Sequence, residues 1–291
     1  MKIALFGADG QVGRETLDAA TNFAALDIIP LRRENADLAT PGAAAEALRR
    51  LNPAAVINAA AWTAVDKAET EIDGARRINA YAVGEIAAAC KEIGARLVHL
   101  STDYVFAGDP APAPLSENAA PSPINVYGAT KLQGEDLARA ANPDTVILRT
   151  SWVYSAHGAN FVKTMLRLSQ SMPEIKVVAD QIGGPTPAAA IATACLTIAG
   201  ANDGPAGLYH FQGAPAVSWA DFAQAIFAAG GRQTKVDPIA TIQYPTPAKR
   251  PKFTVLNCSK IRRDYGLEQP DWRTDLARTV GRLDSLASQG N

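Results

Sequence analysis

The stretch Lys2-Ile-Ala-Leu-Phe-Gly-Ala-Asp-Gly-Gln-Val-Gly13 decides the fold. A short apolar strand leads into three glycines, and an amphipathic segment begins at Val12. Glycines at this spacing let a strand turn sharply into a helix, whose N-terminus attracts a pyrophosphate. The stretch predicts a dinucleotide-binding turn, with a purely structural turn as the alternative. The predicted cofactor contacts in it are Gly7, Gly10, Gln11, Val12 and Gly13.

Short apolar segments alternate with alanine-rich amphipathic segments over the first half of the chain. This pattern is typical of parallel strands joined by right-handed helical crossovers, with helices on both faces of the sheet. The sequence therefore predicts an α/β fold with a doubly wound parallel sheet of the Rossmann type. We expect strands over residues 2–6, 25–31, 54–58, 96–101 and 145–149, and helices from residue 12, over 43–51 and 75–93, and around 127–131.

The spacing of prolines along the chain changes after residue 149. Nine prolines between residues 173 and 251 interrupt shorter elements, which indicates a different architecture. We expect residues 1–150 to form a dinucleotide-binding domain and residues 151–291 to form mainly a smaller C-terminal substrate lobe, with some segments returning to the first domain. Ser218 and Asp221 resemble a capping box at the start of a helix that runs through Ala229.

Composition gives no support for several classes of partner. Lys and Arg total 28 against 29 Asp and Glu, a formal charge of -1, so charge gives no reason to expect nucleic acid or a membrane surface. No apolar run reaches the roughly 20 residues of a membrane span, and the N-terminus does not resemble a signal peptide. We expect a cytoplasmic protein. Cys90, Cys195 and Cys258 lack metal-ligand spacing and are interpreted as buried apolar residues.

The segment after the second strand bears on the choice of coenzyme. An acidic residue there would bind the adenosine ribose diol, whereas this chain has Arg32 and Arg33, which favour the 2′-phosphate of NADP. Two solvated arginines, paired with Glu34, are the alternative. NADPH is thus the expected coenzyme, with NADH as a second possibility. Further predicted cofactor contacts are Asp37 and Leu38 beside the adenine, and Asn58, Ala59, Ala60 and Ala61 along the nicotinamide path.

Tyr127 and Lys131 lie four residues apart, which places them on one face of a helix. An ammonium close to a phenol favours the phenolate and draws its pKa towards neutrality, so this pair suits proton transfer. Thr102 ends the predicted fourth strand, at the sheet edge where such folds bind ligands. Asn79, on the preceding helix, is a weaker candidate. These residues predict hydride transfer with a tyrosine as proton donor.

Four further motifs accompany the glycine turn: Asn58-Ala-Ala-Ala-Trp-Thr-Ala-Val-Asp66, Ser101-Thr-Asp-Tyr-Val-Phe106, Tyr127-Gly-Ala-Thr-Lys131 and Arg149-Thr-Ser-Trp-Val-Tyr154. Together they resemble the extended short-chain dehydrogenase/reductases, and within them the family of dTDP-4-dehydrorhamnose reductases. The likeness continues through Asp180-Gln-Ile-Gly-Gly-Pro-Thr186 and Tyr244-Pro-Thr-Pro-Ala-Lys-Arg-Pro251. It implies NADPH-dependent reduction of the 4-keto group of dTDP-4-dehydro-β-L-rhamnose, the last step in supplying rhamnose for surface polysaccharide.

The resemblance also assigns roles to residues. It implies a catalytic set of Thr102, Tyr127 and Lys131, the last two also binding the coenzyme. Trp152 would form a platform for the deoxysugar, with a core tryptophan as the alternative reading. Arg250 would meet the pyrophosphate of the dTDP-sugar. The full set of implied substrate contacts is Thr63, Ala64, Val65, Thr102, Asp103, Phe106, Trp152 and Arg250.

The chain departs from the family pattern in one respect. Some members are linked as dimers through magnesium, by an acid early in the first helix and acids after the Pro-Thr segment. Glu15 is present here, but Pro185 and Thr186 are followed by Pro187 and three alanines without a carboxylate. The sequence therefore argues against a magnesium bridge and predicts no metal. A homodimer is left open.

Two other functions fit the same scaffold. A nucleotide-sugar 4,6-dehydratase would carry Asp-Glu after the threonine, whereas this chain has Asp103-Tyr104. A 4-epimerase holds NAD, which an acid after the second strand would suit better than Arg32. A non-catalytic NADP-binding regulatory subunit is the rival from another class, because a fold does not guarantee its chemistry.

Overall fold

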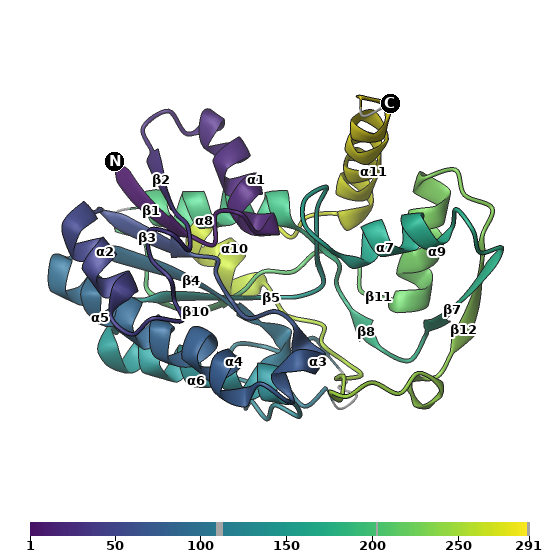
Figure 1. Cartoon of the computed structure of the whole chain (residues 1–291), viewed down its shortest axis with the longest axis horizontal. Helices are drawn as coiled ribbons and strands as arrows, with labels where there is room; N and C mark the ends of the chain where they lie inside the picture. The colour runs from purple at the N-terminus through teal and green to yellow at the C-terminus, as the bar shows by residue number, and fades with distance from the viewer. Residues whose placement is uncertain (109–112, 202, 290–291) are drawn as a thin grey trace.

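The computed structural model describes residues 1–108, 113–201 and 203–289. Figure 1 shows a layered α/β part, which contains the N-terminus, and a smaller lobe beside it. The α/β part is built on a six-stranded sheet with the order β2-β1-β3-β4-β5-β10. Every neighbouring pair in it is parallel. The strands are β1 (Lys2–Phe6), β2 (Asp27–Leu31), β3 (Ala55–Asn58), β4 (Arg96–Thr102), β5 (Val146–Thr150) and β10 (Gly207–His210).

This topology confirms the predicted doubly wound sheet. The chain runs outward from β1 to β2 and then returns to the other side of β1 to form β3. A crevice opens beyond the carboxyl ends of two strands where the winding direction reverses in this way. The turns after β1 and β3 therefore meet where a ligand is expected.

Helices cover both faces of the sheet (Figure 1). One face packs against α1 (Gln11–Ala19) and α8 (Ala188–Gly200), and the other against α2 (Ala43–Leu51), α5 (Ala82–Ile93) and α6 (Val126–Ala141). The strands carry apolar residues on both faces, as burial between two helical layers requires. Although α8, β10 and α10 (Ser259–Tyr265) follow residue 150, they belong to this part of the molecule.

The smaller lobe has its own aromatic core, which includes Tyr154, Phe222 and Trp272. The capping box predicted at Ser218 and Asp221 is present and begins the helix Trp219–Ala229. The lobe contains β6 (Val153–Tyr154), α7 (Phe161–Leu168), β7 (Glu174–Val178), β8 (Ile182–Gly183), β9 (Thr186–Pro187), β11 (Val217–Ser218), α9 (Trp219–Ala229), β12 (Lys235–Ile239) and α11 (Trp272–Gln289).

Four short helical segments pack against α6. They are α3 (Val65–Ala68), α4 (Ile72–Arg76), the π-helical segment η2 (Arg77–Tyr81) and the 3₁₀ turn η3 (Asp103–Val105). Two further 3₁₀ turns are η1 (Ala20–Asn22) and η4 (Thr241–Gln243). Across the described parts of the chain, none of the helices is both long enough and apolar enough to span a membrane.

Candidate functional site

The glycine turn brings the ends of β1 and β3 into close contact. Gly7 has φ +77°, and a Cβ there would lie 2.6 Å from the Ala60 nitrogen. A Cβ on Gly13 would lie 2.1 Å from the Gly7 oxygen, so only glycine lets α1 approach this turn. Gly10 is the N-cap of α1 and makes no side-chain capping bond, which leaves the first amides of the helix free to bind an anion.

A cavity of about 200 Å³ opens beside this turn. Its walls come from the turns after β1, β2 and β3, as expected for the adenosine half of a dinucleotide. The residues that line it are Phe6, Gly7, Ala8, Asp9, Gly10, Leu31, Arg32, Arg33, Ala36, Asp37, Leu38, Ala60, Ala61 and Ile78. The glycine cradle, the uncapped helix and the two arginines fit an NADP-type dinucleotide.

The two arginines after β2 are paired with acids other than Glu34. Arg32 Nε lies 3.1 Å from Asp9 Oδ1, and Arg33 Nε lies 3.9 Å from Asp37 Oδ1. Both pairs are largely exposed, so each is weak and either guanidinium is free to turn towards a phosphate. A 2′-phosphate at this edge has to compete with Asp9 for Arg32.

Several predicted cofactor residues lie beside this cavity without lining it. Val12 and Gly13 are buried in the packing of α1. Gln11 reaches the second lobe instead, where its Oε1 accepts a hydrogen bond from Asn160 Nδ2 at 2.9 Å. The Ala59 backbone closes against Gly7. Gln11 therefore fixes the position of the lobe relative to the start of α1.

Thr102 and Tyr127 meet at the carboxyl end of β4. The Thr102 hydroxyl accepts a hydrogen bond from the Tyr104 amide at 3.1 Å and donates to Asp103 Oδ1 at 3.1 Å. The Thr102 side chain also lowers the pKa of the half-buried Tyr127 phenol. A Cβ on Gly128 would lie 2.1 Å from the Tyr104 oxygen, so this glycine lets α6 bring Tyr127 close to β4.

Among the described residues, the Lys131 ammonium makes no hydrogen bond to Tyr127. Burial raises the pKa of Tyr127 to about 12, and the Thr102 side chain offsets only part of that rise. Lys131 Nζ donates instead to the Leu100 carbonyl oxygen at 2.7 Å. Burial lowers the pKa of Lys131 to about 8. Sequence spacing placed the two side chains on one helix face but could not show that a backbone oxygen competes for the ammonium.

His99 is a site residue that the sequence analysis missed. It lies fully buried on β4, with Nε2 3.4 Å from Lys131 Nζ and Nδ1 3.2 Å from Asn58 Nδ2. Burial and the Lys131 charge hold its pKa well below the usual range, so His99 is neutral. The predicted cofactor residue Asn58 is buried and accepts a hydrogen bond from the Ala60 amide. His99 thus connects the catalytic helix to the turn after β3.

A second buried network supports the same helix. Glu135, on α6, accepts two hydrogen bonds from the Arg149 guanidinium, at 2.8 and 2.6 Å, and one from the Ser101 hydroxyl at 2.5 Å. Both charged side chains are almost completely buried, so removing one partner would leave a buried charge unpaired. The sequence offered no signal for this pair beyond two charged residues within predicted elements.

Asn79 lies in the π-helical segment and is fully buried. Its side chain accepts a hydrogen bond from the Trp62 amide at 2.8 Å and donates to the Trp62 carbonyl oxygen at 3.1 Å. Asn79 also donates to the Thr130 hydroxyl. It therefore holds the turn after β3 against α6, which is a positioning role.

The predicted sugar contacts differ in exposure. Thr63 and Ala64 are exposed, Val65 starts α3, and Asp103 is 2 % exposed beside Thr102. Phe106 is buried and packs against the Arg149 guanidinium and the His210 ring. Its ring is thus occupied by core contacts rather than open to a substrate.

Trp152 and Arg250 approach the sheet edge from the C-terminal half of the chain. Trp152 has φ +43°, a strained conformation for a non-glycine residue, and its indole stacks on Trp219 at 3.5 Å. Gly183 also approaches this indole, because a Cβ there would lie 2.7 Å from Trp152 Cε2. Arg250 Nη2 lies 2.9 Å from Asp66 Oδ2, which ties this segment to α3.

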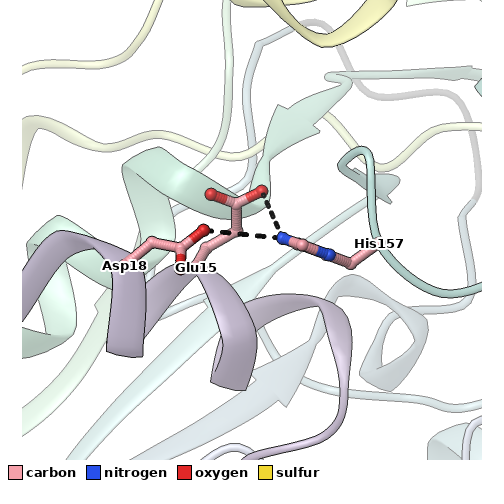
Figure 2. A group of neighbouring side chains, drawn as sticks. All are labelled: Glu15, Asp18 and His157. Carbon is pink, nitrogen blue, oxygen red and sulfur yellow. Dashed lines mark ion pairs between the residues drawn. The ribbon is translucent and has the colours of Figure 1, made fainter. Parts of the chain in front are cut away.

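Among the described residues, one group could hold a metal ion, and the sequence analysis did not predict it. Glu15 and Asp18 on α1 face His157 from the second lobe (Figure 2), with the nearest oxygens 3.8 and 3.6 Å from His157 Nε2. Arg282 already pairs with both carboxylates, at 3.7 and 2.8 Å. A cation would have to displace this guanidinium, so we interpret the group as an ionic contact between α1, the lobe and α11.

Comparison with known proteins agrees with this geometry. A family model described as the RmlD substrate binding domain matches residues 1–285. A dTDP-4-dehydrorhamnose reductase of Sinorhizobium fredii is 41 % identical, and the alignment covers 97 % of this chain and 98 % of that one.

Solved structures show the same similarity. A dTDP-4-dehydrorhamnose reductase from Clostridium acetobutylicum superposes with a TM-score of 0.93 at 38 % identity, over 98 % of this chain and 100 % of that one. The Bacillus anthracis enzyme, solved in complex with NADP, gives 0.90 at 36 %, over 96 % and 98 %. The full-length matches and the site at the sheet edge lead to one conclusion: the chain belongs to the family of dTDP-4-dehydrorhamnose reductases.

Proposed function

We propose that this protein reduces the 4-keto group of dTDP-4-dehydro-β-L-rhamnose to give dTDP-L-rhamnose, with NADPH as the reductant. The observation that carries the proposal is that Thr102 and Tyr127 come together at the carboxyl end of β4, on the same sheet edge as the glycine turn. This pair places a proton donor where a doubly wound sheet binds its ligands. The relatives named above carry out the reaction that their names state, which supports the same activity here.

The coenzyme site follows from the cavity and the turn. The free amides at the start of α1 would bind the pyrophosphate, and Arg32 and Arg33 the 2′-phosphate. Asp37 and Leu38 would border the adenine. NADPH supplies a hydride for the sugar carbonyl when bound there. NADH, which lacks the 2′-phosphate, is expected to bind more weakly.

The chain's own residues supply the proton and stabilise the charge. Tyr127 donates its phenolic proton to the alkoxide oxygen that develops at sugar C4, and the Thr102 hydroxyl would turn from Asp103 Oδ1 to stabilise that oxygen. The buried Lys131 ammonium adds positive charge to the same helix face. One hydride and one proton together convert the ketone to the alcohol.

The sugar nucleotide would enter from the side of the second lobe. Thr63, Ala64 and Val65 would border the approach, and the Trp152 indole would pack on the deoxysugar. Arg250 would exchange its ion pair with Asp66 for the substrate pyrophosphate. Asp103 would contact the sugar at the carboxyl end of β4, next to Thr102.

An assay with synthetic or enzymatically generated dTDP-4-dehydrorhamnose tests the proposal. We expect substrate-dependent loss of NADPH absorbance, slower loss with NADH, and dTDP-rhamnose as the product by chromatography. Release of water from a dTDP-hexose would indicate a dehydratase instead. Coenzyme binding without turnover on any 4-keto sugar would indicate the regulatory-subunit alternative.

Two further parts of the proposal are the location of the enzyme and its oligomeric state. We place the enzyme in the cytoplasm, where NADPH and nucleotide sugars are made, and fractionation with an antibody tests this. A homodimer stays a prediction, and light scattering at several protein concentrations measures it. Matching experiments with and without a chelator show whether the Glu15, Asp18 and His157 group has any part in assembly.

A further inference from the structure

A chain of hydrogen bonds runs from the turn after β3 to Lys131 and passes through His99. The Ala60 amide donates to Asn58 Oδ1 at 3.2 Å, and Asn58 Nδ2 lies 3.2 Å from His99 Nδ1. On the other side of the ring, His99 Nε2 lies 3.4 Å from Lys131 Nζ, which also donates to the Leu100 carbonyl oxygen at 2.7 Å. All three side chains are buried, so they must satisfy one another.

The backbone end of this chain fixes where each group carries its hydrogen. A backbone amide can only donate, so the Asn58 atom that faces Ala60 is the oxygen, and the NH₂ group faces His99. His99 Nδ1 must therefore accept, and it carries no hydrogen. An imidazole with one bare nitrogen is neutral and holds its hydrogen on the other nitrogen. His99 consequently presents an Nε2–H to Lys131.

The protonated form of Lys131 does not match this partner. An ammonium has three N–H donors and no lone pair, so the Nε2–H of His99 would face another donor. A neutral amine has a lone pair that accepts the Nε2–H, and it still donates to the Leu100 oxygen. Moving the ring hydrogen to Nδ1 would only transfer the same conflict to Asn58.

We propose that His99 is a positioning residue that favours the neutral amine of Lys131 over its ammonium. The pattern of donors and acceptors carries the proposal. His99 acts through Lys131, which lies one helical turn from the proton donor Tyr127. The two forms of the lysine differ by one proton, which is exchanged with solvent. Because Ala60 lines the coenzyme cavity, the chain that sets the form of Lys131 begins in the coenzyme site.

Burial acts on Lys131 in the same direction. It lowers the pKa of the ammonium to about 8, while the Glu135 charge, one turn further along α6, opposes the fall. Arg149 on β5 binds Glu135 through two hydrogen bonds, which weakens this opposition. A lysine is charged below its pKa and neutral above it, so the ammonium is lost as pH rises towards about 8.

Other titratable groups on α6 and on the elements packed against it leave this balance in place. Tyr127 stays uncharged in this pH range, because burial raises its pKa to about 12. Asp103 on η3 accepts a hydrogen bond from Thr102. Further charges form ion pairs of their own: Asp66 of α3 with Arg250, Asp73 of α4 with Arg76, Arg77 of η2 with Glu85, and Lys91 of α5 with Asp144.

Nitrogen NMR of protein labelled at histidine tests the hydrogen-bond pattern without substrate or coenzyme. A ring nitrogen that bears hydrogen differs from a bare one in its chemical shift and in its coupling to that hydrogen. The chain has three histidines, so the His99 signals are those that disappear in His99→Leu. We expect a neutral ring with its hydrogen on Nε2. A hydrogen on Nδ1, or a charged ring at neutral pH, would overturn the proposal.

Asn58→Asp reverses the pattern. A carboxylate has no donor, so His99 Nδ1 would carry the hydrogen and donate to it, and Nε2 would become an acceptor for the ammonium. The pKa of Lys131 should then rise by about one unit or more, since a hydrogen bond to a charged group is gained. Carbon NMR of the methylene next to the lysine nitrogen measures this, with the signal assigned by its loss in Lys131→Met.

The added carboxylate also favours an ammonium through its charge alone. The matched control is therefore Asn58→Asp in the His99→Leu background, where the charge acts without the ring. A larger rise in the pKa of Lys131 with the ring than without it supports the proposal, and an equal rise overturns it. If Asn58→Asp does not fold, the hydrogen position on the wild-type ring decides.

Kinetics measure the consequence for the reaction, and this part rests on the proposed reductase activity. Wild-type kcat is expected to fall as pH rises towards 8, because the neutral amine of Lys131 adds no positive charge beside Tyr127. In Asn58→Asp the fall should move to higher pH by about one unit or more. A merely structural effect would lower kcat equally at every pH, and an unmoved profile would overturn the role of His99.

The outcomes separate the two proposals. A protein that shows the hydrogen on His99 Nε2 but turns over no 4-keto sugar at any pH would reject the reductase activity and not the hydrogen-bond pattern. An active protein whose His99 ring carries its hydrogen on Nδ1 would reject the pattern and leave the reductase activity standing.

Discussion

Buried polar side chains dominate the site at the scale of single residues. The Lys131 ammonium lies inside the protein, where the Leu100 carbonyl oxygen and the His99 ring face it. Sequence spacing predicted Tyr127 and Lys131 because a helix has a known repeat. It could not predict His99, because the partner of a buried group depends on which strand lies beside the helix.

Replacing Tyr127 with Phe removes the proton donor and little else. We expect kcat to fall by about two to four orders of magnitude, since general acid catalysis contributes about that much. NADPH affinity, measured by fluorescence titration, should stay within about threefold of the wild-type value. Near-normal turnover in this variant would reject Tyr127 as the acid.

The pairing of Arg32 with Asp9 leads to a prediction about coenzyme choice. Arg32→Ala should raise KM for NADPH about tenfold and change KM for NADH little, because a charge-assisted hydrogen bond to phosphate is lost. Asp9→Asn is the matched change, and it should lower KM for NADPH by freeing the guanidinium. Equal effects on both coenzymes would show that Arg32 does not contact the 2′-phosphate.

At the scale of elements, short apolar runs bounded by glycine and polar residues predicted β1 to β5. The sequence did not predict β10, because its four residues resemble those of many short extended segments. It becomes a strand of the sheet because it pairs with the edge of β5, and this pairing is not visible in the local sequence. The π-helical segment at Asn79 was missed for a similar reason, since it depends on contacts with Trp62 and Thr130 rather than on local preference.

Glycine substitutions test the contact between α1 and the first turn. Gly13→Ala would place a Cβ 2.1 Å from the Gly7 oxygen, so we expect destabilisation by about 1–3 kcal/mol or more and loss of NADPH binding. Gly281→Ala in α11 meets no neighbouring atom within 4 Å and should stabilise by about 0.5–1 kcal/mol. Thermal unfolding measures both. A Gly13→Ala protein as stable as the wild type would contradict the packing described.

For the whole molecule, the raised pKa of Asp103 links stability to pH. An acid whose pKa is higher in the folded state contributes stability below its unfolded pKa, and this contribution is lost as pH rises through about 7. Asp103→Asn should therefore change the free energy of unfolding little near pH 4. At pH 8 it should raise that free energy, by at most ~4 kcal/mol.

Urea unfolding at the two pH values measures this difference. Asp275→Asn serves as the control for a second carboxyl with a raised pKa. A stability difference between wild type and Asp103→Asn that is the same at both pH values would show that Asp103 does not titrate between them.

The position of β10 at the sheet edge has a consequence for synthesis on the ribosome. When residue 150 emerges, the edge of β5 is unpaired, and the sheet face that α8 later covers is still exposed. Translation at about 5–20 residues per second leaves both exposed for seconds before residues 188–210 appear. The nascent chain therefore passes through a stage in which chaperones have an apolar surface to bind, and the sheet is complete only after the first part of the second lobe has been made.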